Sequence, residues 1–219
     1  FKQRFAQVSN PPLDAIREEL VTSTETFLGP EGNLFDETAA QCHQLKLYEP
    51  ILTNRELEKI RQIDSGSLQS TTLSTVFNPS DGSGSMESSM QVLCKEATKA
   101  VSEGSTILVI SDRAADGQNA PIPSLLATAG IHHHLIREGV RTKVGIVVES
   151  GEPREGAHFA LLLGFGAAAI NPYIAFETLY DMAGSEAYPG IADYHKAEKN
   201  YIKALHKGII KIMSKMGIS

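Results

Sequence analysis

The sequence predicts an α/β fold with a mostly parallel sheet built from repeated βα units. Two observations carry this prediction: short apolar runs alternate with helical apolar spacing, and glycines close most of the helical segments. The composition of the 219 residues, 42% hydrophobic and 21% charged, is ordinary for a folded protein. Short continuous apolar runs are typical of strands that are covered on both faces. Alternation of such strands with helices favours a parallel sheet with crossover connections. We therefore expect a partial or degenerate (β/α) barrel-like core after an irregular N-terminal segment.

The regularity of the hydrophobic pattern divides the chain into three regions within one structural unit. Residues 1–66 are irregular, residues 67–190 form the βα-repeat core, and residues 191–219 form a connector helix. In the first region, Pro12 suits the first turn of a helix over residues 12–22. Residues 44–52 read as extended. Thr53 and Glu56 fit a capping box, which predicts a short helix to about residue 63.

Four βα units follow one another in the core. We expect strands at residues 68–77, 106–110, 144–148 and 167–170, and helices at residues 86–101, 123–138, 153–163 and 173–182. This alternation is compatible with a doubly wound sheet and with a (β/α) barrel. Four units are too few to close an eight-stranded barrel, which needs about 250 residues. We therefore expect a half-barrel that missing or neighbouring sequence would complete.

The last helix is amphipathic. Its apolar face is lined by Tyr194, Tyr201, Leu205, Ile209, Ile212 and Met216, and off that face lie Lys196, Lys199, Lys203, Lys207 and Lys211. The favoured interpretation is a surface helix with a solvated basic side. The sharper alternative is a connector that docks on the next domain.

Composition excludes several classes of protein. The formal net charge of −6, without a long basic run, argues against a nucleic-acid surface. No apolar run reaches the ~18 residues of a membrane span. Cys94 occupies an apolar helical position, and both Cys42 and Cys94 suit a reducing compartment.

Polar residues follow the predicted strands, where parallel α/β proteins place their chemistry. They lie in the stretches 78–85, 111–113, 149–154 and 171–172. Asp112 and Arg113 could hold a substrate or a cation, or could cap a turn and pair with each other. Glu149 and Glu152 supply two carboxylates, but three residues apart in a loop they have no fixed geometry for acid–base catalysis.

Other candidate sites are weaker. Gly82 and Gly84 do not form a phosphate-binding motif, and residues 164–166 read as a helix stop. His132, His133 and His134 point about 100° apart on a helix, so they cannot converge on one metal. A meeting of one of them with His158 across a helix interface remains an alternative. The residues therefore predict no catalytic, cofactor-binding or metal-ligating site.

Five stretches of the chain resemble sequences of a single protein family. They are residues 1–19, 131–139, 148–160, 171–177 and 211–219. Together, in order, they span the chain, and they resemble the central domain of the glutamate synthase large subunit, running into the start of its synthase domain. The lack of an initiator methionine at Phe1, and an ending that reads as the start of a new element, fit a piece of a larger protein.

The resemblance implies a role as part of an enzyme. The family's large subunit has an amidotransferase domain, a central domain, an FMN-binding synthase domain and a β-helical domain. Ammonia released from glutamine travels through a tunnel and is added to 2-oxoglutarate, and reduced FMN completes the synthesis of glutamate. The central domain resembles the FMN barrel in topology, carries no flavin, holds the two active sites in register and borders the tunnel.

The same resemblance sets the expected cofactors, partners and compartment. FMN and an iron–sulfur cluster are expected in the parent enzyme and none in this piece. The partners are the amidotransferase and FMN synthase domains of the same polypeptide, with a small electron-transfer subunit or ferredoxin as donor, and no nucleic acid or membrane. The bacterial cytoplasm is the expected compartment, and the plastid is the alternative.

Two further hypotheses remain open. One is a free-standing α/β domain that binds FMN or a phosphorylated molecule near Ser150, Gly151 and Asn171. The other is a zinc hydrolase built on the histidines at 132–134 and His158, which helix geometry disfavours. As a piece of a larger protein, the chain should also expose apolar faces around Phe1, Phe5 and Val8, and around Ile209, Ile212 and Met216.

Overall fold

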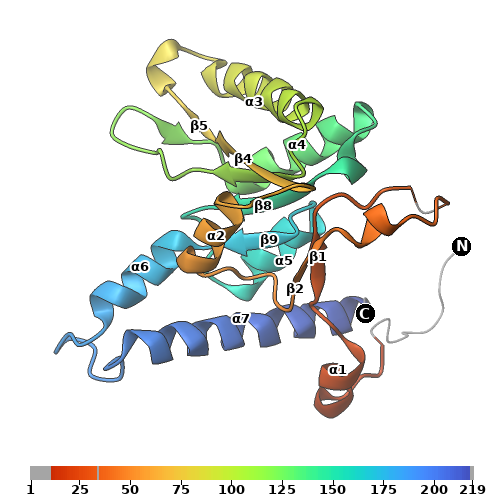
Figure 1. The fold of residues 1–219 in the computed structure, drawn as a ribbon. Helices are drawn as coiled ribbons and strands as arrows, with labels where there is room; N and C mark the ends of the chain where they lie inside the picture. The colour runs from red at the N-terminus through yellow and green to blue at the C-terminus, as the bar shows by residue number, and fades with distance from the viewer. Residues whose placement is uncertain (1–10, 34, 218–219) are drawn as a thin grey trace, which may run out of the picture.

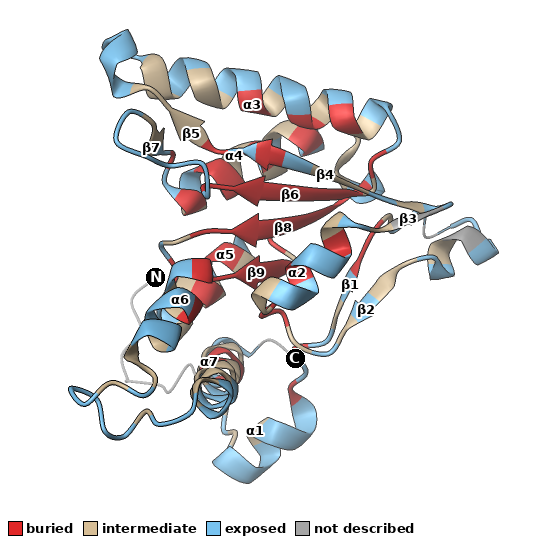
Figure 2. Cartoon of the chain, turned by 60° about the vertical axis from the view of Figure 1, so that its left-hand side comes forward, coloured by how far each residue is buried: buried red, intermediate tan, exposed pale blue. Residues whose placement is uncertain are grey.

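A parallel sheet forms the centre of the molecule in a computed structural model that describes residues 11–33 and 35–217. The strand order is β3-β4-β6-β8-β9 (Figure 1, with β3 and β6 labelled in Figure 2). Four strands run parallel: β4 (Leu68–Ser74), β6 (Ile107–Ser111), β8 (Gly145–Glu149) and β9 (Ala169–Asn171). The short β3 (Asp64–Ser65) is antiparallel to β4 at one edge. The predicted mostly parallel sheet is confirmed.

One face of this sheet is covered by helices. They are α3 (Ser85–Ser102), α4 (Ser124–Arg137), α5 (Gly156–Gly164), α6 (Tyr173–Met182) and α7 (Tyr194–Met216). Buried side chains from all five helices join alternate strand residues, such as Leu108, Ile146 and Ile170, in a single apolar cluster. Strand side chains alternate between faces, so the other half of each strand must be covered from the opposite side.

The N-terminal segment covers that opposite face. It contributes β1 (Thr26–Leu28), β2 (Leu45–Leu47) and α2 (Asn54–Arg61). Four of its side chains, Leu28, Leu52, Leu57 and Ile60, pack on Ile107, Val109, Val147 and Ala169. Figure 2 shows the resulting sandwich, with β6, β8 and β9 buried along their length. The N-terminal segment therefore contains short helices and strands, and it supplies four of the eight buried side chains of this second apolar cluster.

The topology selects between the two architectures that the sequence left open. Consecutive parallel strands are neighbours in the sheet, and the helices that follow them pack on one face. A doubly wound sheet reverses its strand order and carries helices on both faces, whereas sequential order with helices outside is the arrangement of a (β/α) barrel. The core is therefore an open half-barrel, with the N-terminal segment on its inner face.

The strand predicted over residues 68–77 is divided in two. It breaks at Thr75, whose backbone amide donates to the Ser111 carbonyl and whose carbonyl accepts from the Ile122 amide. The continuation β5 (Val76–Phe77) pairs with β7 (Ala120–Pro121) in a separate two-stranded sheet. Short 3₁₀ turns complete the chain at Ala39–Cys42, Pro79–Asp81 and Arg141–Lys143.

The predicted exposed faces have mixed outcomes. Ile209 is 1% exposed and packs into the domain's own core, so that part of the prediction is wrong, whereas Met216 is 67% exposed. Phe1, Phe5 and Val8 lie outside the described residues. The helix α1 (Ala15–Val21) begins after Asp14, whose carboxylate accepts from two backbone amides. Within the described ranges, the structure has no helix that is both long and apolar enough to cross a membrane.

Candidate functional site

The carboxyl ends of β6, β8 and β9 bring together three of the four polar stretches that the sequence singled out. Asp112, Glu149, Ser150 and Asn171 are each at most 3% exposed there. The fourth stretch, residues 78–85, follows β5 and closes on itself, with the Asn78 carboxamide accepting from the Ser80 amide at 2.9 Å. The candidate site is therefore the strand-end cluster formed by the first three stretches.

Glu149 is the centre of this strand-end cluster. Its carboxylate, only 1% exposed, accepts a hydrogen bond from the Ser111 hydroxyl and forms ion pairs with Arg61 and Arg113. Burial acts to raise the pKa of Glu149, but the donors of Ser111, Arg61 and Arg113 outweigh it and hold the pKa below its ordinary value. A carboxylate held ionised by three donors is poorly suited to exchange protons.

Arg113 links three elements. Its Nε lies 2.8 Å from Glu149 Oε1, and one terminal nitrogen lies 3.0 Å from Glu177 Oε1 on α6. The guanidinium also stacks over the Tyr173 ring, 4.1 Å from its centroid. Arg113 does not pair with Asp112, so the pairing considered from the sequence is wrong. Successive strand-end side chains point to opposite sides of the sheet, which separates these two neighbours.

Asp112 makes its own set of contacts. Its carboxylate accepts from the Ser150 hydroxyl at 2.5 Å and from the Gly151 amide at 3.1 Å. Burial raises the pKa of Asp112 above its ordinary value, and these two hydrogen bonds oppose the rise without cancelling it. Burial and the neighbouring Asp112 carboxylate also raise the pKa of the Tyr173 hydroxyl. The Asp112 side chain thus joins the end of β6 to the turn after β8.

The side chain of Glu152 caps the N-terminus of α4 and does not lie with Glu149 as a catalytic pair. Its carboxylate accepts from the backbone amide and the hydroxyl of Ser124, at 2.7 and 2.6 Å, at the start of α4. A carboxylate at a helix N-terminus satisfies an otherwise unpaired amide and is favoured by the helix dipole. The two carboxylates therefore do have fixed positions, contrary to expectation, but each is committed to different structural partners.

Asn171 closes the cluster against the N-terminal segment. Its amide nitrogen donates to the Leu52 carbonyl and to the Asn54 side chain, both at 2.9 Å.

A hollow of about 300 Å³ lies beside Glu152 and is lined also by Arg154, His158 and Leu162. This hollow lies along α5, and the residues that line it do not include Asp112, Glu149 or Asn171.

The histidines lie in separate environments. His132 Nδ1 accepts from Arg141 at 3.0 Å, and His134 Nε2 lies 2.8 Å from the Thr98 hydroxyl. His158 Nδ1 accepts from the Arg154 amide at 3.1 Å. Among the described residues, no three His, Cys, Asp or Glu side chains are grouped as a metal site would require.

Sequence reasoning missed Arg61, Tyr173 and Glu177 as members of the cluster. Arg61 is 88 residues from Glu149 and ends a helix whose local signal is a capping box, so nothing nearby in the chain marks it. Tyr173 lies in the stretch 171–177 that carries the resemblance, and its place directly after a strand was the available signal.

The structure thus defines a class of protein: an α/β half-barrel domain whose strand-end polar side chains are tied to one another. Over residues 1–219 the sequence matches the family model described as glutamate synthase central domain. The chain belongs to this family, the central domain of glutamate synthase.

Relatives with curated names support the same family. The chain is 46% identical over 219 residues to "Glutamate synthase [NADPH] large chain" of Bacillus subtilis, covering all of this chain and 14% of that one. It is 39% identical to "Ferredoxin-dependent glutamate synthase" of Pyropia yezoensis, again over all of this chain and 15% of the relative. The chain therefore spans about one seventh of the length of these relatives.

Solved structures resemble the chain more distantly. The flavin-binding domain of baker's yeast flavocytochrome b2 matches 78% of this chain and 36% of its own, with 18% identity and a TM-score of 0.46. A mandelate oxidase mutant matches 68% of this chain and 36% of its own, with 13% identity and a TM-score of 0.44. Neither likeness carries a functional inference.

Proposed function

We propose that this domain is a non-catalytic part of a glutamate synthase that positions the amidotransferase and FMN synthase domains and borders the ammonia tunnel. The parent enzyme would make glutamate reductively from glutamine and 2-oxoglutarate. Ammonia released into bulk water would be protonated, and so it must be contained on its way between two active sites. A rigid domain between them is a direct means of containment.

One observation carries the non-catalytic role. The ends of the parallel strands, where βα proteins place their chemistry, are occupied by Glu149, Asp112 and Asn171, and these side chains are hydrogen-bonded to partners within the domain. The two carboxylates, Glu149 and Asp112, already have partners and so have little capacity to bind and orient a substrate, although the buried Asn171 Oδ1 has no hydrogen-bond partner among the described residues. The cluster instead ties α2, α6 and the ends of three strands into one body.

The residues present do not fit a flavin at the strand ends. The buried Asp112 and Glu149 carboxylates lie there, and their charge would repel the flavin phosphate. The inner face is filled by Leu28, Leu52, Leu57 and Ile60, each at most 3% exposed. In this proposal FMN and the iron–sulfur cluster of the parent enzyme are held outside the domain. The electron donor, whether a small subunit or ferredoxin, would likewise dock elsewhere on the parent, and the bacterial cytoplasm or plastid would be its compartment.

The alternative of a phosphate or FMN site near Ser150, Gly151 and Asn171 has less support. The Ser150 hydroxyl and the Gly151 amide both donate to the Asp112 carboxylate. An anionic ligand would have to displace this carboxylate and then remain beside it, which like-charge repulsion disfavours.

The test separates positioning from chemistry in the full-length polypeptide that carries this domain. Arg113→Met removes the side chain that joins Glu149 to Glu177. We expect glutamine hydrolysis and ammonia-dependent glutamate synthesis to stay within about twofold of wild type, while the glutamate formed per glutamine hydrolysed falls several-fold.

Two controls accompany this measurement. Lys99→Met removes an equal charge from an exposed ion pair with Glu103 on α3 and should change none of the rates. Arg113→Lys keeps the charge but not the planar, forked donor set and should lie between the two. A large loss of ammonia-dependent synthesis in a folded Arg113→Met enzyme would show that the domain takes part in the chemistry.

A further inference from the structure

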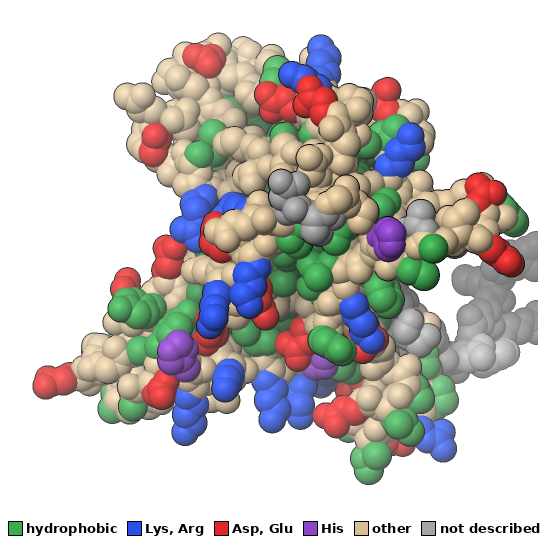
Figure 3. Space-filling model, viewed as in Figure 1, with side chains coloured by type: hydrophobic (Ala, Val, Ile, Leu, Met, Phe, Trp, Pro, Cys, Tyr) green, Lys and Arg blue, Asp and Glu red, His purple; other side chains and the backbone are tan. Residues whose placement is uncertain are grey.

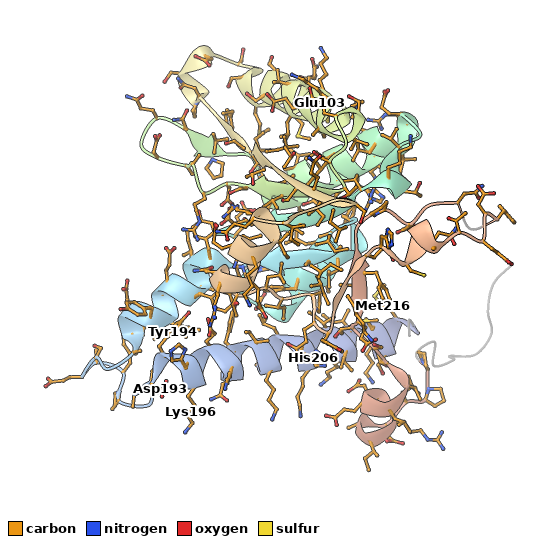
Figure 4. The ribbon with its side chains drawn as sticks, in the orientation of Figure 1. Glu103, Asp193, Tyr194, Lys196, His206 and Met216 are labelled. Carbon is orange, nitrogen blue, oxygen red and sulfur yellow. The ribbon has the colours of Figure 1, made fainter. Side chains whose placement is uncertain are left out.

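Helix α7 presents a row of lysines to solvent. Lys196, Lys199, Lys203, Lys207 and Lys211 are spaced three or four residues apart, so they lie along one side of the helix, and all are exposed. We call these five residues the basic stripe. Figure 3 shows Lys and Arg side chains gathered along the lower edge of the molecule below α7, and in Figure 4 Lys196 points away from the body.

The charge of α7 is opposite to that of the rest of the chain. The helix contains six lysines and one glutamate, a net charge of +5. Because the whole chain carries −6, the remaining residues carry −11. Positive charge is therefore concentrated on a single helix of an acidic domain.

The domain itself does little to neutralise this stripe. Among the described residues, the stripe has one ion pair, Lys207 with Glu19 at 3.4 Å, between two well-exposed side chains. The lone glutamate of the helix, Glu198, accepts a hydrogen bond from Tyr194 at 2.7 Å. Like charges at i,i+4 repel and destabilise a helix, so the stripe is unfavourable for the domain alone. An acidic partner would relieve that repulsion.

Helix α1 lies beside the stripe and adds an apolar patch. Ile16 and Leu20 are 86% and 84% exposed. A groove of about 530 Å³ between α1 and α7 is lined by side chains of both signs, among them Glu19, Lys203, Lys207 and Lys211. Exposed carboxylates next to the apolar patch would be repelled by an anionic membrane or a nucleic acid, whereas a protein surface can match an apolar patch with a charged rim.

We propose that the basic stripe, with Ile16 and Leu20 of α1 at its edge, is the docking surface for an acidic face of another domain of the same polypeptide. The relatives supply the reason for this source. The segment that matches this chain is 14% of the Bacillus subtilis large chain, so most of that polypeptide lies outside it and stays tethered to it. Tethering raises the effective concentration of a partner face to about the millimolar range. This inference rests on the proposed positioning function and names the surface that performs it.

Zero-length cross-linking of the full-length polypeptide tests the proposal. A carbodiimide joins amines only to carboxylates in direct contact, and mass spectrometry identifies the pairs. We expect Lys203, Lys207 or Lys211 to be joined to Asp or Glu residues outside residues 1–219. The pair Lys46–Glu25, at 2.9 Å within the domain, is the positive control.

The source of each cross-link is read from a mixture of ¹⁴N- and ¹⁵N-labelled polypeptide. Cross-links of a single isotope place the acidic face in the same chain and support the proposal. Isotopically mixed cross-links would assign the surface to a second copy and overturn it. The proposal would also be overturned if the lysines of the basic stripe formed cross-links only to Glu19 while the control cross-link between Lys46 and Glu25 formed normally.

A charge-reversal variant separates this inference from the function on which it rests. In K203E/K211E we expect the yield of Lys207 cross-links to the other domain to fall at least fivefold, whereas K95E/K99E on α3 leaves it unchanged. An unchanged yield in K203E/K211E would overturn the docking surface. Failure of the positioning function would appear differently, as intact glutamate yield per glutamine hydrolysed in K203E/K211E although the cross-links are lost.

Discussion

At the scale of single residues, Glu149 connects elements that lie far apart in the chain. It joins α2 through Arg61 and the end of β6 through Ser111 and Arg113. Removing one member of a buried ion pair is costly because the remaining charges lose their partner. Arg61 and Arg113 would both be left without their shared carboxylate.

We predict that Glu149→Gln lowers the free energy of unfolding by roughly 3 kcal/mol. The matched control is Glu58→Gln, which removes the exposed second partner of Arg61 and should cost less than about 1 kcal/mol. Urea unfolding of both variants measures the difference. Equal costs for the two substitutions would show that burial of Glu149 adds nothing to its role.

The same substitution should change the acid sensitivity of the domain. The donors of Arg61, Arg113 and Ser111 hold the pKa of Glu149 below its ordinary value of 4.5 against the effect of burial. A carboxyl group whose pKa is depressed by folding stabilises the native state above its unfolded pKa, and this contribution is lost as the pH falls through the folded pKa. The difference in unfolding free energy between wild type and Glu149→Gln should therefore begin to shrink as the pH falls below about 4.5, and it should vanish only below the lowered pKa of folded Glu149. A gap between them that stays constant down to acid pH would contradict this.

Gly166 illustrates a backbone requirement. It has a φ of 110°, and a Cβ built on it would collide with the ring of His132. Arg141 holds this corner together by donating to His132 Nδ1, to the Val144 carbonyl and to the Gly166 carbonyl. The left-handed backbone and the close approach both exclude a side chain at Gly166.

We predict that Gly166→Ala costs more than about 2 kcal/mol of unfolding free energy, from backbone strain and the displaced His132 ring together. Gly139→Ala is the control, because Gly139 has a φ of 69° with nothing within 4 Å of its built Cβ. It should cost only the strain, about 1 kcal/mol. Thermal unfolding of the two variants tests the order, and a milder effect at Gly166 would contradict it.

At the scale of elements, the sequence predicted the periodic segments well. α3, α4, α6 and α7 begin and end within about three residues of their predicted bounds, because apolar spacing and closing glycines mark them. β1 and β7 were not predicted, since strands of two or three residues have no measurable alternation. α5 begins at Gly156 instead of Pro153, since Glu155 before it has an extended backbone.

The site was less predictable than the fold. Position at the ends of buried strands identified Asp112, Arg113, Glu149 and Asn171, but their pairing depends on contacts between distant segments. Arg61 reaches Glu149 across 88 residues of chain, and no local pattern encodes such a contact. The boundary at residues 66 and 67 between the irregular part and the core stays a prediction.

Two glycines, Gly156 and Gly208, face each other where α5 and α7 pack together. A Cβ at Gly208 would lie 3.7 Å from the Gly156 Cα, which is ordinary van der Waals contact. We predict that Gly208→Ala stabilises the domain by about 0.5–1 kcal/mol, because alanine is favoured over glycine within a helix. Gly208→Leu should instead destabilise it by forcing the helices apart, typically by 1–3 kcal/mol. Denaturant unfolding that gives the same sign for both variants would contradict this.

At the scale of the whole molecule, the N-terminal segment fills the inner face of the half-barrel, and polar side chains tied to partners within the domain fill the strand ends. We predict that calorimetric titration of the domain with FMN shows no saturable binding, because the Asp112 and Glu149 carboxylates at the strand ends are held by partners of the domain and would repel the flavin phosphate. A flavin-binding (β/α) barrel protein titrated in the same buffer is the positive control. Saturable micromolar binding would restore the hypothesis of a free-standing ligand-binding domain.

The covering of the inner face by the N-terminal segment has a consequence for synthesis on the ribosome. Leu52 is hydrogen-bonded to Asn171, which lies 119 residues later in the chain. At about 5–20 residues per second, translation supplies that partner about 6–24 seconds after Leu52 has been made. The N-terminal elements of the domain are thus made before the strands on which they pack, and until those strands emerge Leu28, Leu57 and Ile60 are available to chaperones.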